Sequence, residues 1–161
     1  MSAPLLILGW GNLSRGDDAL GPLFLQQLRE RLPPEKLAQI DFLDDFQLQI
    51  EHALDMVGRQ QVLFVDASLT CPAPFEVTRL QAVQDASFTT HTLSPQALMF
   101  IYRQLQGEPP PPCTQLAIRG EAFELGEPPG EAALTHLDAA LRWALDALRG
   151  GVLSVVLAEL A

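Results

Sequence analysis

Two short runs of apolar residues most constrain the fold of this chain. Residues 5–8 and 62–65 contain no polar side chain, and the first run stops at Gly9 while the second stops at Asp66. Strands that are buried on both faces have this pattern, and such strands are typical of parallel sheets that helices cover on both sides. The two runs therefore predict central strands of an α/β fold.

The rest of the sequence predicts helices that alternate with strands. Apolar residues recur at three- and four-residue steps in four stretches: 20–32, 48–57, 95–105 and 133–148. In the second stretch this spacing places Ile50, Leu54 and Val57 on one side of a helix. Three shorter stretches indicate strands: 40–43, 75–80 and 114–118. The order predicts one α/β domain, a three-layer sandwich with a mostly parallel, twisted sheet and helices on both faces.

Composition narrows the class of protein. The chain has 161 residues, of which 48% are hydrophobic and 19% charged, as in a single globular domain. Its formal net charge of −10 argues against a nucleic-acid partner and against an anionic membrane surface. There is no signal-peptide pattern and no apolar stretch near the roughly 20 residues of a membrane span. We expect a cytoplasmic protein, whose apolar end at residues 152–161 is compatible with a helix, a strand or a partner surface.

Acidic residues follow the predicted strands. Ligands of an open α/β sheet bind beyond the carboxyl ends of its strands, so these positions are candidates for a site. They are Asp17, Asp18, Asp44, Asp45 and Asp66. His91 lies in a loop three residues before Ser94, the expected N-cap of a helix. Two carboxylates and one imidazole, brought together by separate loops, suit a borderline divalent metal ion and leave coordination positions open.

Each candidate also has an ordinary structural interpretation. Asp18 can cap the first helix, Asp66 can accept hydrogen bonds from loop amides, and His91 can be hydrogen-bonded within its loop. Polar residues in such loops commonly serve turns and caps. Residue chemistry alone therefore leaves both interpretations open.

Other common sites are excluded by the motifs. Gly9 and Gly11 begin a dinucleotide-binding fingerprint, but its third glycine position is Ser14. Asp17 and Asp18 would moreover repel a pyrophosphate at the start of the helix. The Walker A, H-E-x-x-H and G-x-S-x-G motifs are absent, and Cys71 and Cys113 form no metal or redox motif.

The first loop resembles the signature of a known family. Residues 7–21, ILGWGNLSRGDDALG, are similar to the G-x-G-N-x-x-x-x-D-[DE]-x-x-G motif of the [NiFe]-hydrogenase maturation endopeptidases. The positions that this motif implies for shaping the loop are Gly9, Gly11, Asn12, Asp17 and Gly21. Three further segments resemble the family in the right order: residues 64–67, 90–94 and 119–121.

The resemblance implies an endopeptidase that removes the C-terminal extension from the large-subunit precursor of a [NiFe]-hydrogenase after nickel insertion. The family's nickel-binding positions fall on Asp18, Asp66 and His91. The nickel is carried by the substrate, so the resemblance implies no cofactor of the protein's own. Residues 46–52 resemble the branch that serves soluble, NAD-reducing hydrogenases.

This sequence departs from the family pattern at two places. Asp18 stands where many members carry Glu, and residues 44–47, DDFQ, replace an Asp-Gly-Gly-Thr-like turn. No Ser, Thr or Cys is placed as a nucleophile, so we expect water to attack, with Asp44 as a candidate for orienting it. Two alternatives stay open: a nickel-binding hydrogenase chaperone without proteolysis, and a small-molecule metallohydrolase that keeps its own ion.

Overall fold

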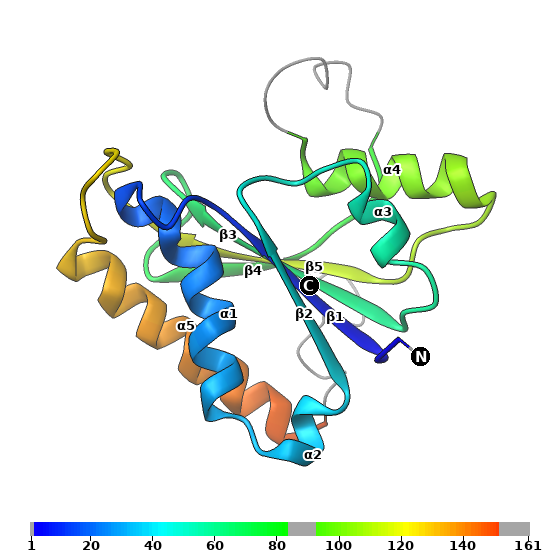
Figure 1. Cartoon of the computed structure of the whole chain (residues 1–161), viewed down its shortest axis with the longest axis horizontal. Helices are drawn as coiled ribbons and strands as arrows, with labels where there is room; N and C mark the ends of the chain where they lie inside the picture. Colours follow the sequence, from blue (N-terminus) through cyan, green and yellow to red (C-terminus); the bar gives the residue numbers. More distant parts are fainter. Residues whose placement is uncertain (1, 84–92, 152–161) are drawn as a thin grey trace.

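A five-stranded sheet with the order β2-β1-β3-β5-β4 forms the centre of the molecule (Figure 1). The computed structural model describes residues 2–83 and 93–151, so His91 and the apolar tail at 152–161 lie outside the described residues. The strands are β1 (Leu5–Trp10), β2 (Ile40–Asp45), β3 (Gln61–Ser68), β4 (Phe75–Arg79) and β5 (Cys113–Arg119). Of the five described strands only β4 is antiparallel to its neighbour, and it lies at one edge of the sheet.

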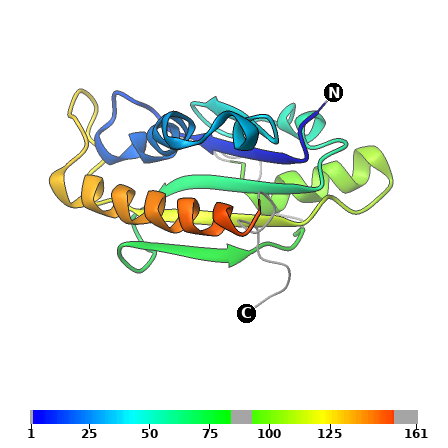
Figure 2. The same ribbon diagram turned by 90° about the horizontal axis from the view of Figure 1, so that it is seen from below.

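Helices cover both faces of the sheet, which confirms the predicted three-layer α/β sandwich. The elements are the 3-10 turn η1 (Gly16–Ala19), α1 (Leu20–Arg31), α2 (Pro34–Leu37), α3 (His52–Asp55), α4 (Pro95–Gln106) and α5 (Glu131–Arg149). Alternate residues of β1 point to opposite faces: Leu5 and Ile7 pack with α1 and α5, whereas Leu6 and Leu8 pack with α3 and α4. Figure 2 shows β4 at the far edge of the sheet, with β3 and β5 between it and β1. Among the described residues, no helix is both long and apolar enough to cross a membrane.

The predicted helix over residues 48–57 is wrong in length and in phase. Only α3 is helical within it, and the buried residues are Leu48, His52, Ala53 and Met56. The apolar side of the predicted helix is exposed, by 48% at Ile50, 62% at Leu54 and 40% at Val57. The His52 side chain explains the short helix: its Nδ1 accepts the Gln49 N–H at 2.8 Å, so the chain before α3 forms a side-chain-closed turn.

Candidate functional site at the carboxyl ends of the strands

The glycines of the first loop allow the start of α1 to press against two strand ends. A Cβ atom on Gly11 would lie 2.0 Å from the Asp18 carbonyl oxygen, and its φ of +146° is also unfavourable for other residues. A Cβ on Gly21 would lie 2.5 Å from the Trp10 carbonyl oxygen and 3.0 Å from that of Val65. The loop between β1 and α1 is thereby held against the ends of both β1 and β3.

This packing brings together Asp18 and Asp66, two of the three residues that the family motif assigns to nickel. Asp18 is half-buried, and its Oδ2 accepts the backbone N–H of Asn12 at 2.9 Å. Asp66, near the end of β3, is also half-buried. Burial of the Asp66 carboxyl, reinforced by the negative charge of Asp18, raises the pKa of Asp66 to about 7. The two carboxyl groups therefore repel each other, and a bound cation would relieve that repulsion.

The third expected ligand, His91, lies outside the described residues. Within residues 2–83 and 93–151, no three His, Cys, Asp or Glu side chains are grouped so that they could hold a metal ion. The three-residue nickel site thus stays a prediction.

Asp17, the neighbour of Asp18, has a different environment. Its side chain is 2% exposed, and its carboxylate accepts backbone N–H groups from Glu121 at 2.6 Å, Ala122 at 3.1 Å and Gly130 at 2.8 Å. Burial by itself would raise the pKa of Asp17, but these three hydrogen bonds, assisted by the charge of His136, lower it below its usual value. Asp17 thus fastens η1 to the segment that follows β5.

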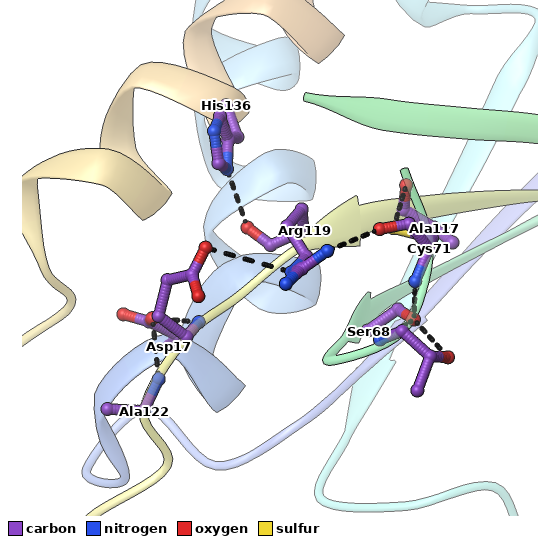
Figure 3. Close-up of polar contacts among 9 residues, drawn as sticks. Asp17, Ser68, Cys71, Ala117, Arg119, Ala122 and His136 are labelled. Atoms are coloured by element: carbon purple, nitrogen blue, oxygen red, sulfur yellow. Dashed lines mark hydrogen bonds and ion pairs between the residues drawn. The ribbon is translucent and has the colours of Figure 1, made fainter. Parts of the chain in front are cut away.

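Figure 3 shows the hydrogen bonds that hold the end of β5, next to the contact that Asp17 makes with the following segment. Nδ1 of His136 in α5 lies 2.9 Å from the Arg119 carbonyl oxygen, so this nitrogen carries the proton and donates it. The Arg119 guanidinium donates to the Cys71 carbonyl oxygen at 2.9 Å. Burial raises the pKa of the Cys71 thiol, which argues against an activated nucleophile there. The family-like segment at 119–121 therefore lies within a network that supports the first loop.

The two acids at the end of β2 also differ from each other in their surroundings. The Asp45 carboxylate accepts the Phe46 N–H at 2.7 Å and lies 3.4 Å from Nε2 of His52. The Asp45 carbonyl also accepts the Gly11 N–H at 3.0 Å, which ties β2 to the first loop. Asp44 is exposed, and it stands beside Gly9 in the pairing of β2 with β1. Sequence reasoning missed the Asp45–His52 contact, for which only the seven-residue spacing gives a signal.

Replacing Asp66 with Asn is expected to stabilise the protein above neutral pH. Because its pKa is raised, the folded chain holds the Asp66 proton more tightly than the unfolded chain, and stability is lost as pH rises from about 4 through 7. Asn does not ionise, so the variant should gain about 2–4 kcal/mol over the parent at pH 8 and less at pH 4.5. Urea unfolding with a chelator present measures both values. Asp44→Asn, at an exposed carboxylate, is the control, and an Asp66→Asn gain that is equal at both pH values would contradict the argument.

The fold is similar to solved structures of hydrogenase maturation proteases. The endopeptidase HybD from Escherichia coli is 25% identical, with 93% of each chain covered and a TM-score of 0.69. The maturation protease HycI from Thermococcus kodakarensis is 19% identical, covers 91% of this chain and 93% of its own, and has a TM-score of 0.70. The endopeptidase HycI from Escherichia coli is 18% identical, with 100% of this chain and 97% of that chain covered and a TM-score of 0.65.

The sequence itself matches no protein-family model, and no curated protein matches it either. The relationship rests on the similarity of the whole fold and on the ordered segments that begin with the glycine-rich loop. These two observations are independent, because the fold comparison does not depend on the identity of the loop residues. Together they confirm the resemblance of this chain to the [NiFe]-hydrogenase maturation endopeptidases.

Proposed function

We propose that this protein is an endopeptidase that removes the C-terminal extension of a [NiFe]-hydrogenase large-subunit precursor once nickel has been inserted. The reaction would take place in the cytoplasm. Asp18, Asp66 and His91 would bind the nickel that the precursor carries, so the protein needs no resident metal. The single observation that carries this proposal is the proximity of two half-buried carboxyl groups, Asp18 and Asp66, at the carboxyl ends of the strands.

The electrostatics of this pair suit a metal that arrives with the substrate. Without a cation, burial and repulsion favour the protonated form of Asp66, so the pair does not carry two full charges near neutral pH. Nickel binding would displace the proton, and affinity would therefore rise with pH. Such a site discriminates a nickel-loaded precursor from an empty one, because only the former supplies the charge that compensates both carboxylates.

Hydrolysis needs a water molecule, a proton acceptor and a site for the leaving amine. We assign the orientation of the water to Asp44, the exposed acid beside Gly9 at the end of β2. In this scheme water adds to the scissile carbonyl carbon, a carboxylate accepts its proton, and that proton passes to the departing nitrogen as the C–N bond breaks. Asp17 and Asp45 are assigned structural roles, since three backbone N–H groups engage the Asp17 carboxylate, and both the Phe46 N–H and the His52 ring contact that of Asp45.

The test is the intact mass of a hydrogenase large-subunit precursor, nickel-loaded or nickel-free, before and after incubation with this protein. We expect loss of a C-terminal peptide from the nickel-loaded precursor only. A precursor loaded with zinc in place of nickel shows whether processing depends on the identity of the metal or only on its charge.

The other outcomes separate the alternatives. Stable association without any change in mass would indicate the nickel-binding chaperone. A divalent ion that co-purifies in one-to-one ratio and survives dialysis would favour the small-molecule metallohydrolase. Cleavage of both precursors at equal rates would refute nickel recognition while leaving the peptidase activity.

A further inference from the structure

The outer edge of β2 carries no partner strand within the described part of the chain. β2 pairs with β1 on one side, and β4 occupies the opposite edge of the sheet. An edge strand directs about half of its backbone N–H and C=O groups away from the sheet, where they can pair with an added strand. Figure 1 looks onto this edge: β2 crosses in front of β1, with α1 and α2 on one side and α3 on the other.

Two surface pockets lie at this edge, one along β2 and one between α1 and the end of β2, and we call them together the β2 groove. The first, of about 390 Å³, has residues 40–43 as its floor, Leu37 and Arg29 on one wall, and Asp55 and Arg59 on the other. The second, also of about 390 Å³, shares Arg29 with the first and is lined mainly by one side of α1, together with Leu13 and Asp44; its α1 residues are Pro22, Leu25, Gln26, Arg29 and Glu30. Each volume is within the range of known ligand sites.

The β2 groove is continuous with the candidate site. Its second pocket ends at Leu13, whose neighbour Asn12 donates the backbone N–H that holds Asp18. The same pocket includes Asp44, the acid that we assign to the water. A chain lying along the groove would therefore reach the loop that carries Asp18.

We propose that the β2 groove binds an extended segment of the substrate polypeptide, which pairs with the open edge of β2 as an added strand. This inference rests on the proposed function and extends it, because it assigns the path along which the scissile bond reaches the site. Backbone pairing would supply affinity, while the two pockets would accept side chains of the substrate.

The charge of β2 selects this occupant over a second copy of the same chain. β2 has the sequence IDFLDD, with three carboxylates and no basic residue. The two pockets hold more acids than arginines, so two copies that paired along this groove would bring like charges together; the charged residues are Glu30, Asp41, Asp44 and Asp55 against Arg29 and Arg59. The net charge of −10 adds to this repulsion. The occupant is therefore an uncharged or basic extended segment.

The walls of the groove are already fixed. Arg59 forms an ion pair with Asp41 and donates to the carbonyl oxygens of Asp55 at 2.9 Å and Ala3 at 3.0 Å. The Arg29 guanidinium carbon lies 4.8 Å from the centre of the Phe42 ring. Because these side chains are already held in place, binding of a peptide would cost little side-chain conformational entropy in the groove.

The first test measures binding of synthetic peptides whose sequence spans the cleavage site of a hydrogenase large-subunit precursor. One backbone amide at a time is N-methylated. Strand addition predicts a period of two, since alternate residues of the peptide direct their N–H toward β2. Methylation at these positions should lower the affinity by about tenfold, and methylation between them by about twofold or less. A loss without this alternation would overturn the proposal.

The second test uses a matched pair of photo-cross-linking variants, Phe42→p-benzoylphenylalanine and Phe75→p-benzoylphenylalanine. Both positions are half-buried aromatics on edge strands that pack against the same face of the sheet, but Phe75 is on β4. With the nickel-loaded precursor, we expect cross-links from position 42 to the segment around the scissile bond and none from position 75. Equal capture at both edges would overturn the proposal, and circular dichroism establishes that both variants are folded.

These tests fail separately from the proposed function. If the precursor is processed but the methylation pattern does not alternate, the proposed peptidase activity is supported and the proposed binding of substrate in the β2 groove is refuted. If the peptides bind with the alternating pattern but the nickel-loaded precursor is never shortened, binding in the β2 groove is supported and the proposed endopeptidase activity is refuted.

Discussion

Asp18→Asn is expected to slow the processing of a nickel-loaded precursor by about 100-fold or more without weakening the fold. Loss of a residue that only supports a metal ligand already costs about 10- to 100-fold, so loss of a direct ligand's charge should cost at least as much. The fold should survive, because the Asn oxygen can still accept the Asn12 N–H that Asp18 accepts at 2.9 Å. Intact-mass kinetics measure the rate, and urea unfolding measures the stability, which should change by less than about 0.5 kcal/mol.

The neighbouring Asp17 supplies the matched control for this prediction. Asp17→Asn makes the same chemical change one residue away, but there it removes a buried charge that three backbone N–H groups engage. We expect Asp17→Asn to lose stability and Asp18→Asn to lose activity. Asp66→Asn should behave like Asp18→Asn in the rate of processing. If Asp18→Asn processes the precursor at the parent rate, Asp18 is not part of the site.

Much of this fold could be predicted from the sequence because its central strands are buried on both faces. Uninterrupted apolar runs such as residues 5–8 and 62–65 leave little choice of structure. The approach of Asp18 to Asp66 was also predictable, because parallel strands end at one edge of the sheet and ligand sites gather there.

In residues 48–57 the apolar pattern does not determine which side of the segment is buried. They contain two apolar stripes, and periodicity alone does not say which stripe is buried. The burial of Leu48 and Met56 and the capture of the Gln49 N–H by His52 decide it, and both depend on the packing of the whole molecule. A local pattern that fits two phases equally well therefore needs tertiary information.

The role of Asp17 could not be predicted for a related reason. Its hydrogen-bond donors are backbone N–H groups, which every residue except proline has, and the first of them belongs to Glu121, 104 positions further along the chain. No side-chain pattern identifies such partners. The family motif marks Asp17 as a loop residue, and the structure adds the contact that explains why an acid stands there.

Asp17→Ala is expected to be the most destabilising change of an acidic residue in the first loop. It leaves three N–H donors of residues 121, 122 and 130 without their acceptor, in a place where the Asp17 side chain is 2% exposed. Hydrogen bonds to charged groups contribute about 1.5–3 kcal/mol each, and part of the loss is recovered by water, so we expect about 3–5 kcal/mol at pH 7. Urea unfolding measures it, with the exposed Asp138→Ala on α5 as the control, expected within about 0.5 kcal/mol of the parent.

The pH dependence of this loss separates a charge effect from a simple packing defect. The pKa of Asp17 is lowered in the folded state, so its contribution is fully present above the unfolded pKa of about 3.9 and is lost as pH falls through the folded value. The gap between parent and Asp17→Ala should therefore stay large from pH 5 upward, and it should narrow at lower pH as the carboxylate is protonated. A gap that stays the same at the lowest pH at which both proteins fold would mean that the cavity accounts for the loss. In that case the three N–H contacts would contribute little, and the segment after β5 would have to be held by Arg119 and His136 instead.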